Sequence, residues 1–179
     1  MGFKDLISQC KQNDRRAQKS LVDAYAPFLF SISIRYMRDA EEAQDNVQET
    51  LISIFKNLDQ FKEEEPSFRA WIKKICVNNA LQKFRKKSYS HETYPEQLPE
   101  NNVEMPSVYA KLGADELMGI ISQLPEMYRQ VFCMYVIEDY SHKEIGEKLH
   151  MKESSSRSAL TRAKKMIKEK LWQLQKVVA

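Results

Sequence analysis

The sequence predicts an all-α protein made of two helical domains joined by a flexible linker. Glycine occurs only 4 times in 179 residues, too few for the turns of a β-sandwich or the glycine-rich loops of a nucleotide-binding α/β fold. Apolar residues instead recur at the three- and four-residue spacing of amphipathic helices. An acidic, proline-containing stretch, residues 89–112, separates two such segments, residues 1–88 and 113–179. Each segment is long enough to form its own small core.

The first segment contains two apolar stripes and a further helix. The stripes predict core-facing surfaces and consist of Leu21, Tyr25, Phe28, Leu29, Ile32 and Tyr36, and of Val47, Leu51, Ile54, Phe55 and Leu58. Asp39 is the predicted N-cap of the second stripe's helix, with Glu42 placed to complete a capping box. The next helix is predicted to open at Ser67, after Pro66, and to run to Phe84. These helices predict a compact bundle.

The second segment begins with shorter apolar helices. The first apolar stripe comprises Leu117, Ile120, Ile121 and Leu124. Pro125 then restarts a helix at a first-turn position, which proline tolerates. The buried face predicted for that helix consists of Val131, Phe132, Tyr135 and Val136.

The stretch YSHKEIGEKLHMKESSSRSALTRAKK (Tyr140 to Lys165) has the pattern of a helix-turn-helix. Ser141 and Glu144 form a capping box before a short helix that stops near His150. A three-residue turn, residues 150–152, leads into a long helix from about Glu153. The inward face of that helix contains Leu160, Ala163, Ile167 and Leu171. A short helix, a tight turn and a longer basic helix are typical of DNA-binding domains.

The overall composition excludes several classes of protein. Three cysteines, Cys10, Cys76 and Cys133, lie far apart, without the CxxC spacing or the even number of a secreted disulfide framework. The most apolar stretch, residues 24–34, is too short to span a bilayer and contains Pro27, and no signal-peptide pattern is present at the start. We therefore expect a cytoplasmic protein with no membrane insertion.

Charge is segregated along the chain, although the net charge is only +3 at pH 7. Residues 39–65 are strongly acidic, residues 66–90 contain basic residues and no acid, and the last helix is again basic. Two basic surfaces on two domains favour a long polyanion that is bound at two places. Either basic run taken alone is explained equally well as a solvated helix face.

The residues around the basic side chains favour nucleic acid as that polyanion. In residues 66–90 the bases are interleaved with aromatic and amide side chains, which stack on and hydrogen-bond to unpaired bases. At the front of the last helix, small hydroxyl side chains stand beside arginines, as the reading of base edges in a major groove requires. Trp71, considered alone, is better explained as a core residue.

Three stretches resemble the extracytoplasmic-function (group IV) sigma factors of bacterial RNA polymerase, a group of the sigma-70 family. DAEEAQDNVQETLISIFKNLDQF (Asp39 to Phe61) and FRAWIKKICVNNALQKFRKK (Phe68 to Lys87) are similar to the family's regions 2.2 to 2.4. LPEMYRQVFCMYVIEDYSHKEIGEKLHMKESSSRSALTRAKK (Leu124 to Lys165) is similar to region 4. The resemblance covers nearly the whole chain except the linker.

The resemblance implies a factor that binds core polymerase and directs promoter recognition, DNA melting and transcription initiation. It implies region 2 in residues 1–88 and region 4 in residues 113–179, on either side of the acidic linker. The implied partners are core RNA polymerase and promoter DNA, both as duplex and as melted strand. An anti-sigma factor is a further candidate partner.

The resemblance also implies roles for individual residues. The implied polymerase-binding residues are Asp45, Gln48 and Glu49. The implied contacts to the −10 element are Phe68, Arg69, Trp71, Lys74, Asn78, Asn79, Gln82 and Arg85. The implied contacts to the −35 element are Ser154, Ser155, Arg157, Ser158, Thr161, Arg162 and Lys165. The family has one asparagine where Asn78 and Asn79 are adjacent, so the register stays open between them.

The sequence departs from the family at several positions. Gln82 replaces a common aspartate, and Ala159 replaces a common arginine of the recognition helix. Lys152 replaces a serine cap, and His150 replaces a glycine at the turn. Either His150 takes a backbone conformation that glycine adopts more cheaply, or the turn differs slightly. The triplet at 154–156 replaces a Gly-Thr-Val-like stretch, which should change promoter preference rather than fold.

Two other functions are weighed against a sigma factor. A dimeric helix-turn-helix regulator of duplex DNA would leave the basic, aromatic run of residues 66–90 without a purpose. A helical metalloenzyme would have to use dispersed cysteines, carboxylates and the three histidines, and no HExxH spacing is present. We therefore expect no enzymatic activity, no metal and no other cofactor.

Overall fold

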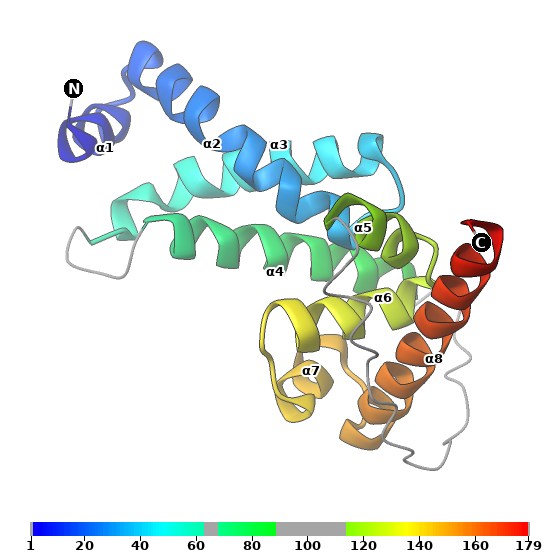
Figure 1. Ribbon diagram of the computed structural model, residues 1–179. Helices are drawn as coiled ribbons and strands as arrows, with labels where there is room; N and C mark the ends of the chain where they lie inside the picture. The colour runs from blue at the N-terminus through cyan, green and yellow to red at the C-terminus, as the bar shows by residue number, and fades with distance from the viewer. Residues whose placement is uncertain (1, 63–67, 89–113, 179) are drawn as a thin grey trace. The chain divides into compact units, whose positions relative to one another are not determined.

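The computed structural model describes residues 2–62, 68–88 and 114–178, and every regular element in these ranges is a helix (Figure 1), which confirms the all-α prediction. The chain divides into two compact units, Met1–Lys83 and Phe84–Ala179, and the division falls inside one helix. The stretch predicted as a linker, residues 89–112, lies outside the described residues. None of the described helices has the length and apolar character needed to cross a membrane.

The first unit is built from four α-helices and one short 3-10 turn (Figure 1). They are α1 (Phe3–Lys11), α2 (Arg15–Tyr36), α3 (Ala40–Asn57), η1 (Leu58–Gln60) and α4 (Phe68–Ser88), of which α4 continues beyond the unit. The Asp14 carboxylate caps α2 by accepting from the N–H groups of Arg16 and Ala17. α2 therefore starts before the predicted stripe, and α1 is an element that the sequence analysis did not predict.

The start of α3 confirms the predicted N-cap but differs in the partner of Glu42. The Asp39 side chain accepts from the Glu42 N–H at 2.9 Å. The Glu42 carboxylate accepts from the backbone N–H of Arg38 at 3.2 Å and from the Arg38 guanidinium at 2.9 Å. Glu42 thus binds the residue before the cap rather than Asp39 itself, because Arg38 offers a cation as well as an N–H group.

The core of the first unit is formed by the inner faces of α2, α3 and α4. Most of both predicted stripes is buried there, together with α4 residues such as Ile72 and Cys76. Tyr25, Phe28, Leu51 and Phe55 of the stripes are only half-buried. Burial of these apolar faces supplies the main driving force for packing the bundle.

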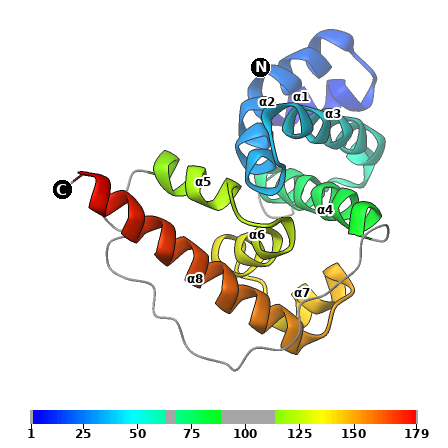
Figure 2. The ribbon, with the colours of Figure 1, turned by 90° about the vertical axis from the view of Figure 1, so that its right-hand side faces the viewer.

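The second unit contains the helix-turn-helix (Figure 2). Its elements are α5 (Ala114–Ser122), α6 (Glu126–Phe132), the π-helical turn η3 (Cys133–Ile137), α7 (His142–Leu149) and α8 (Glu153–Val178). The predicted capping box is present, since Glu144 N–H donates to Ser141 Oγ and Ser141 N–H donates to the Glu144 carboxylate. The hydrogen bonds from Ser141 hold the pKa of the Glu144 carboxyl below its usual value.

The predicted buried face of α6 is wrong at two positions. Tyr135 and Val136 are 38% and 45% exposed, whereas Cys133 and Met134 are buried. The cause is η3, in which the Glu138 N–H donates to the carbonyl of Cys133, five residues earlier. A π-helical turn holds one residue more than an α-helical turn, so the three- and four-residue spacing that predicts Tyr135 and Val136 as buried does not apply through η3.

His150 ends α7 in the left-handed conformation, with φ 55° and ψ 42°. This conformation costs most residues about 1–2 kcal/mol, whereas glycine adopts it freely at some cost in chain entropy. We expect His150→Gly to stabilise the helix-turn-helix by about 0.5–1 kcal/mol, measured by thermal unfolding. His150→Ala keeps a Cβ in the strained position and should bring no gain, and equal stabilisation by both variants would contradict this explanation.

Candidate nucleic-acid interface

One side of α3 is an exposed acidic face. Asp45, Gln48 and Glu49 follow one another at helical spacing and are all exposed, while Asn46 and Thr50 on the opposite side are buried. Ile52 continues this face one turn later and is 54% exposed. No role for Ile52 follows from the sequence pattern, and its position among acidic and amide neighbours offers a partner one apolar contact.

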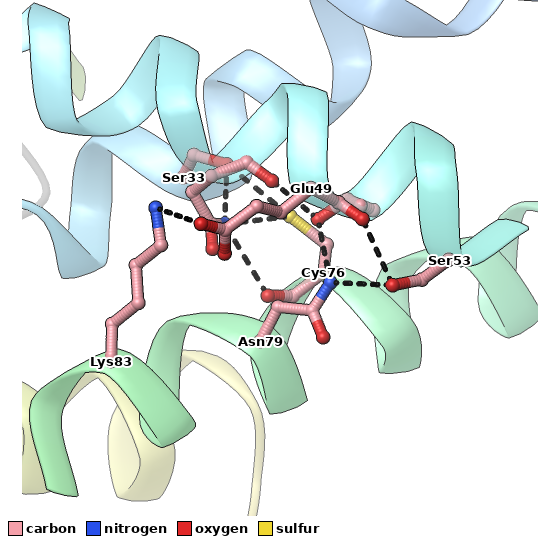
Figure 3. A network of polar contacts seen from close by, with 8 residues as sticks. Ser33, Glu49, Ser53, Cys76, Asn79 and Lys83 are labelled. Carbon is pink, nitrogen blue, oxygen red and sulfur yellow. Dashed lines mark hydrogen bonds and ion pairs between the residues drawn. The ribbon is translucent and has the colours of Figure 1, made fainter. Parts of the chain in front are cut away.

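A polar network joins α3 to α4 (Figure 3). Asn79 Nδ2 donates to Thr50 Oγ1 at 3.4 Å and to Ser53 Oγ at 3.3 Å. One turn further along α4, Lys83 Nζ lies 3.2 Å from Glu49 Oε1. Asn79 and Lys83 therefore face α3, and both fix the position of α4 against it.

A second, buried group of polar atoms lies deeper in the same unit. Asn46 Nδ2 on α3 donates to Ser33 Oγ of α2 at 2.9 Å and to the carbonyl of Cys76 of α4 at 3.4 Å. Ser33 Oγ also lies 3.3 Å from Cys76 Sγ. Because these contacts join one residue from each of α2, α3 and α4, the cluster links the three helices (Figure 3), although the Asn46 side-chain oxygen is buried without a hydrogen-bond partner.

The residues predicted to bind the −10 element lie on more than one side of α4. The largest group lies at successive three- and four-residue steps and so shares one side of the helix. It consists of Trp71, Lys74, Asn78, Gln82 and Arg85, of which Lys74 and Gln82 are exposed and the others half-buried. Asn79 faces α3 instead. Arg69 is exposed on another side, with its guanidinium 4.7 Å from the centre of the Phe28 ring.

Phe68 belongs to an aromatic cluster and is only 4% exposed. Its ring centre lies 5.4 Å from that of Phe3, 5.0 Å from that of Tyr25 and 5.2 Å from that of Phe61. Trp71 packs on the edge of the same cluster, 5.3 Å from Phe61. Because Phe68 is enclosed by other rings, its contribution is to anchor the start of α4 rather than to stack on a base.

The residues predicted to bind the −35 element also differ in what they can reach. Ser154, Arg157, Thr161 and Lys165 lie on one outward side of α8, with Thr161 half-buried and the others exposed. Ser158 is only 8% exposed, and Ser155 is half-buried. Arg162 is half-buried and donates to the Tyr128 hydroxyl at 3.0 Å.

Two further contacts fix the front of α8. The Arg157 guanidinium lies 2.6 Å from the carboxylate of Glu153, one turn earlier. The ring of buried His142 on α7 is 2.9 Å from Ser156 Oγ, and the same ring stacks on Tyr135. The second contact ties the two helices of the helix-turn-helix together.

The described residues contain no group of three or more histidine, cysteine or acidic side chains that could hold a metal ion. The cysteines Cys10, Cys76 and Cys133 are all buried, and none of them forms a disulfide. Burial raises the pKa of the Cys10 thiol, and the nearby charge of Asp14 raises it further, so this sulfur stays protonated.

Comparison with known protein families gives two matches on this chain. Residues 21–89 match the model for sigma-70 region 2, and residues 114–167 match the model for sigma-70 region 4. The first match contains α3 and α4, and the second contains the helix-turn-helix. The two matches follow each other in the order expected from the sequence.

Comparison with characterised proteins and solved structures points in the same direction. The chain is 27% identical to the ECF RNA polymerase sigma factor SigW of Bacillus subtilis, over 96% of this chain and 97% of that protein. It is 26% identical to the RNA polymerase sigma-H factor of Pseudomonas aeruginosa, over 93% of this chain and 92% of that protein. In the co-crystal structure of sigma factor RpoE with the anti-sigma factor NepR from Bartonella quintana, a chain 19% identical in sequence shares the fold with a TM-score of 0.50, over 86% of this chain and 95% of that chain.

Proposed function

The chain belongs to the sigma-70 family, in its extracytoplasmic-function group. We propose that it acts as a sigma factor whose first unit binds core polymerase and the −10 element and whose second unit binds the −35 element. Such a factor binds core RNA polymerase and promoter DNA and directs promoter recognition, DNA melting and transcription initiation. The observation that carries this function is the presence of both family regions on one chain in the family's order. A dimeric regulator of duplex DNA needs only the helix-turn-helix, so it is not favoured.

The acidic face of α3 is the proposed docking surface for core polymerase. Asp45, Gln48 and Glu49 are exposed on one side of a helix whose other side is buried, so they are available to a protein partner. Ile52 adds an exposed apolar side chain to the same face. An acidic surface with an apolar contact suits a basic partner surface and repels DNA.

The outward side of α4 is the proposed contact to the melted −10 strand. Lys74 and Arg85 supply charge for phosphates, while Asn78 and Gln82 supply amides for base edges, and the edge of Trp71 supplies a stacking surface. Extruding a base costs a few kcal/mol, and stacking on an aromatic ring returns about 1–3 kcal/mol per base. Phe68 and Asn79 hold α4 in place through the aromatic cluster and through hydrogen bonds to α3, respectively.

The outward side of α8 is the proposed contact to the −35 duplex. Ser154, Arg157, Thr161 and Lys165 carry the direct contacts, because they share one side of the helix. Ser155, Ser158 and Arg162 are less accessible and act by positioning that side. We assign residues 1–88 to region 2, residues 113–179 to region 4 and the acidic residues 89–112 to the linker between them.

The protein contributes binding free energy to promoter recognition, and the polymerase catalyses RNA synthesis. It is not itself an enzyme in this proposal and needs no cofactor. Its place of action is the cytoplasm, where it meets polymerase and DNA. An anti-sigma protein that covers the α3 or α4 surface would hold it inactive. The Bartonella quintana sigma factor RpoE, which shares the fold, was crystallised in complex with the anti-sigma factor NepR.

Substitution by alanine is expected to have different effects at the two neighbouring asparagines, Asn78 and Asn79. Asn79→Ala removes two hydrogen bonds to α3 and should lower the free energy of unfolding by about 1–2 kcal/mol. Asn78→Ala should weaken binding of a −10 single strand by holoenzyme more than Asn79→Ala does, because Asn78 lies on the side of α4 that is assigned to the strand. Thermal unfolding and fluorescence anisotropy measure the two effects. If Asn79→Ala impairs strand binding without loss of stability, the assignment is reversed.

Co-elution and promoter opening test the proposed division of work. The protein is mixed with core polymerase and a library of promoter fragments, and complexes are isolated by gel filtration. Bound fragments are then probed with permanganate, which modifies unpaired thymines. We expect a stable complex and reactive thymines at the −10 element only when both proteins are present. A protein that fails to co-elute with core polymerase would overturn the assignment.

A further inference from the structure

Glu153 is an acidic residue at the front of a helix whose other charged residues are mostly basic. It opens α8, and its side chain is 47% exposed beside the 46% exposed side chain of Arg157. A carboxylate in this place repels DNA phosphates and therefore lowers non-specific affinity. It also favours the helix N-terminus and forms a surface ion pair, effects worth only about 0.3–1 kcal/mol each. These structural effects do not depend on which base pairs lie opposite.

The side chains around Glu153 leave few groups that can reach into a groove. Ser154 is short, Ser156 is fully buried, and Ser158 is nearly so. Arg162, two turns along, is held by Tyr128. At the front of α8, Glu153 and Arg157 are thus the long polar side chains on the outward side, and they are one turn apart.

The contact between the two residues restricts the guanidinium. Arg157 Nη2 donates to Glu153 Oε1 at 2.6 Å, a short, charge-assisted bond. Arginine donates through a planar fork of five N–H groups, so a guanidinium held at one edge can present another edge to guanine O6 and N7. A carboxylate in turn accepts from the N4 amino group of cytosine, which is its characteristic base contact in a major groove.

We propose that Glu153 is a specificity-determining residue of the −35 contact: it accepts a hydrogen bond from cytosine N4 and at the same time holds Arg157 toward a neighbouring guanine. This proposal rests on the proposed function, in which α8 enters the major groove. The ion pair cancels the charge of Glu153 locally, so the carboxylate can approach the base edges beside the phosphates. The result is a preference for cytosine at one position of the upstream element.

Selection from a randomised −35 element tests the proposal. Holoenzyme formed with the wild-type protein, Glu153→Gln or Arg157→Ala selects duplexes whose sequences are then read. Glutamine has the size of glutamate but pairs with adenine N6 and N7. We expect Glu153→Gln to lower the preference for cytosine about 5- to 100-fold at one position and to raise adenine there. Arg157→Ala should reduce a guanine preference at a different position.

Glu169→Gln is the matched control, because Glu169 is an exposed acid on the same helix and loses the same charge. Its selected sequence should equal that of the wild type. An unchanged sequence with Glu153→Gln, or changes confined to the position that Arg157→Ala alters, would overturn the proposal while leaving the sigma-factor function intact. A wild-type holoenzyme without any −35 preference would instead refute the assignment of α8 to the duplex.

Discussion

Asp45→Lys is expected to weaken binding to core RNA polymerase by about 10- to 100-fold. Asp45 is exposed on the acidic face of α3 that we assign to docking, next to Gln48 and Glu49. A lysine there loses an attraction to a basic partner and adds a like-charge contact, and the expected loss corresponds to about 1.4–2.8 kcal/mol of binding free energy. Titration of labelled protein with core polymerase measures the change.

Asp23→Lys provides the matched control for this charge reversal. Asp23 lies on α2 of the same unit and pairs with Lys19 in an exposed ion pair of little energetic value. Its reversal changes the total charge equally and should leave polymerase affinity within about twofold. Equal losses for both variants would show that net charge alone governs binding, and unchanged affinity with Asp45→Lys would remove α3 from the docking surface.

Gly146→Ala is expected to destabilise the helix-turn-helix by about 1–3 kcal/mol and to weaken binding of the −35 duplex. A Cβ at Gly146 would lie 2.8 Å from the carbonyl oxygen of Met151 and 3.6 Å from the N atom of Glu153. The turn is held there by the hydrogen bond from Met151 N–H to the Gly146 carbonyl, 3.0 Å long. An added methyl group therefore pushes away the turn that positions the start of α8.

Gly119→Ala distinguishes this crowding from the general effect of alanine in a helix. Gly119 is exposed on α5, and a Cβ there would meet nothing within 4 Å. Alanine at such a site stabilises by about 0.5–1 kcal/mol, since it restricts the unfolded chain. Thermal unfolding should thus show opposite signs for the two substitutions. Stabilisation by both substitutions would mean that the turn near Met151 moves to accommodate the added methyl group without a loss of stability.

The helix-turn-helix and the start of α3 could be predicted because their signals are local. Asp39 and Ser141 cap helices through hydrogen bonds to N–H groups three residues away. The left-handed turn at His150 was also a predicted possibility and is confirmed by its φ of 55°. Such contacts are encoded within a few neighbouring residues, so one sequence is enough to find them.

α1 shows a signal that was present but not used. Phe3, Leu6, Ile7 and Cys10 have the spacing of one helix face, and Ile7 and Cys10 are buried. Its role in the aromatic cluster depends on Phe61 and Phe68, which lie far away in sequence. That contact could not be predicted from periodicity.

Three features of the site depend on tertiary packing and have no local signal. Tyr135 lies in the π-helical turn η3 and is exposed, although its spacing is that of a buried residue. The direction of Asn79 is decided by where α3 lies, since Asn78 beside it has the same chemistry. The enclosure of Phe68 likewise depends on rings from three other elements. In each case the sequence gives the type of side chain, but the direction in which the side chain points depends on how the helices pack.

Run-off transcription tests the central claim most directly. Core polymerase and a promoter library are incubated with nucleotides, with and without the protein, and transcripts are sequenced. The sigma-factor function predicts transcripts that start from a defined set of promoters and require both the protein and core polymerase, with fewer transcripts when Asp45→Lys replaces the wild type. If no transcript depends on the protein while it still binds duplex DNA, it acts as a helix-turn-helix regulator and the claim is contradicted.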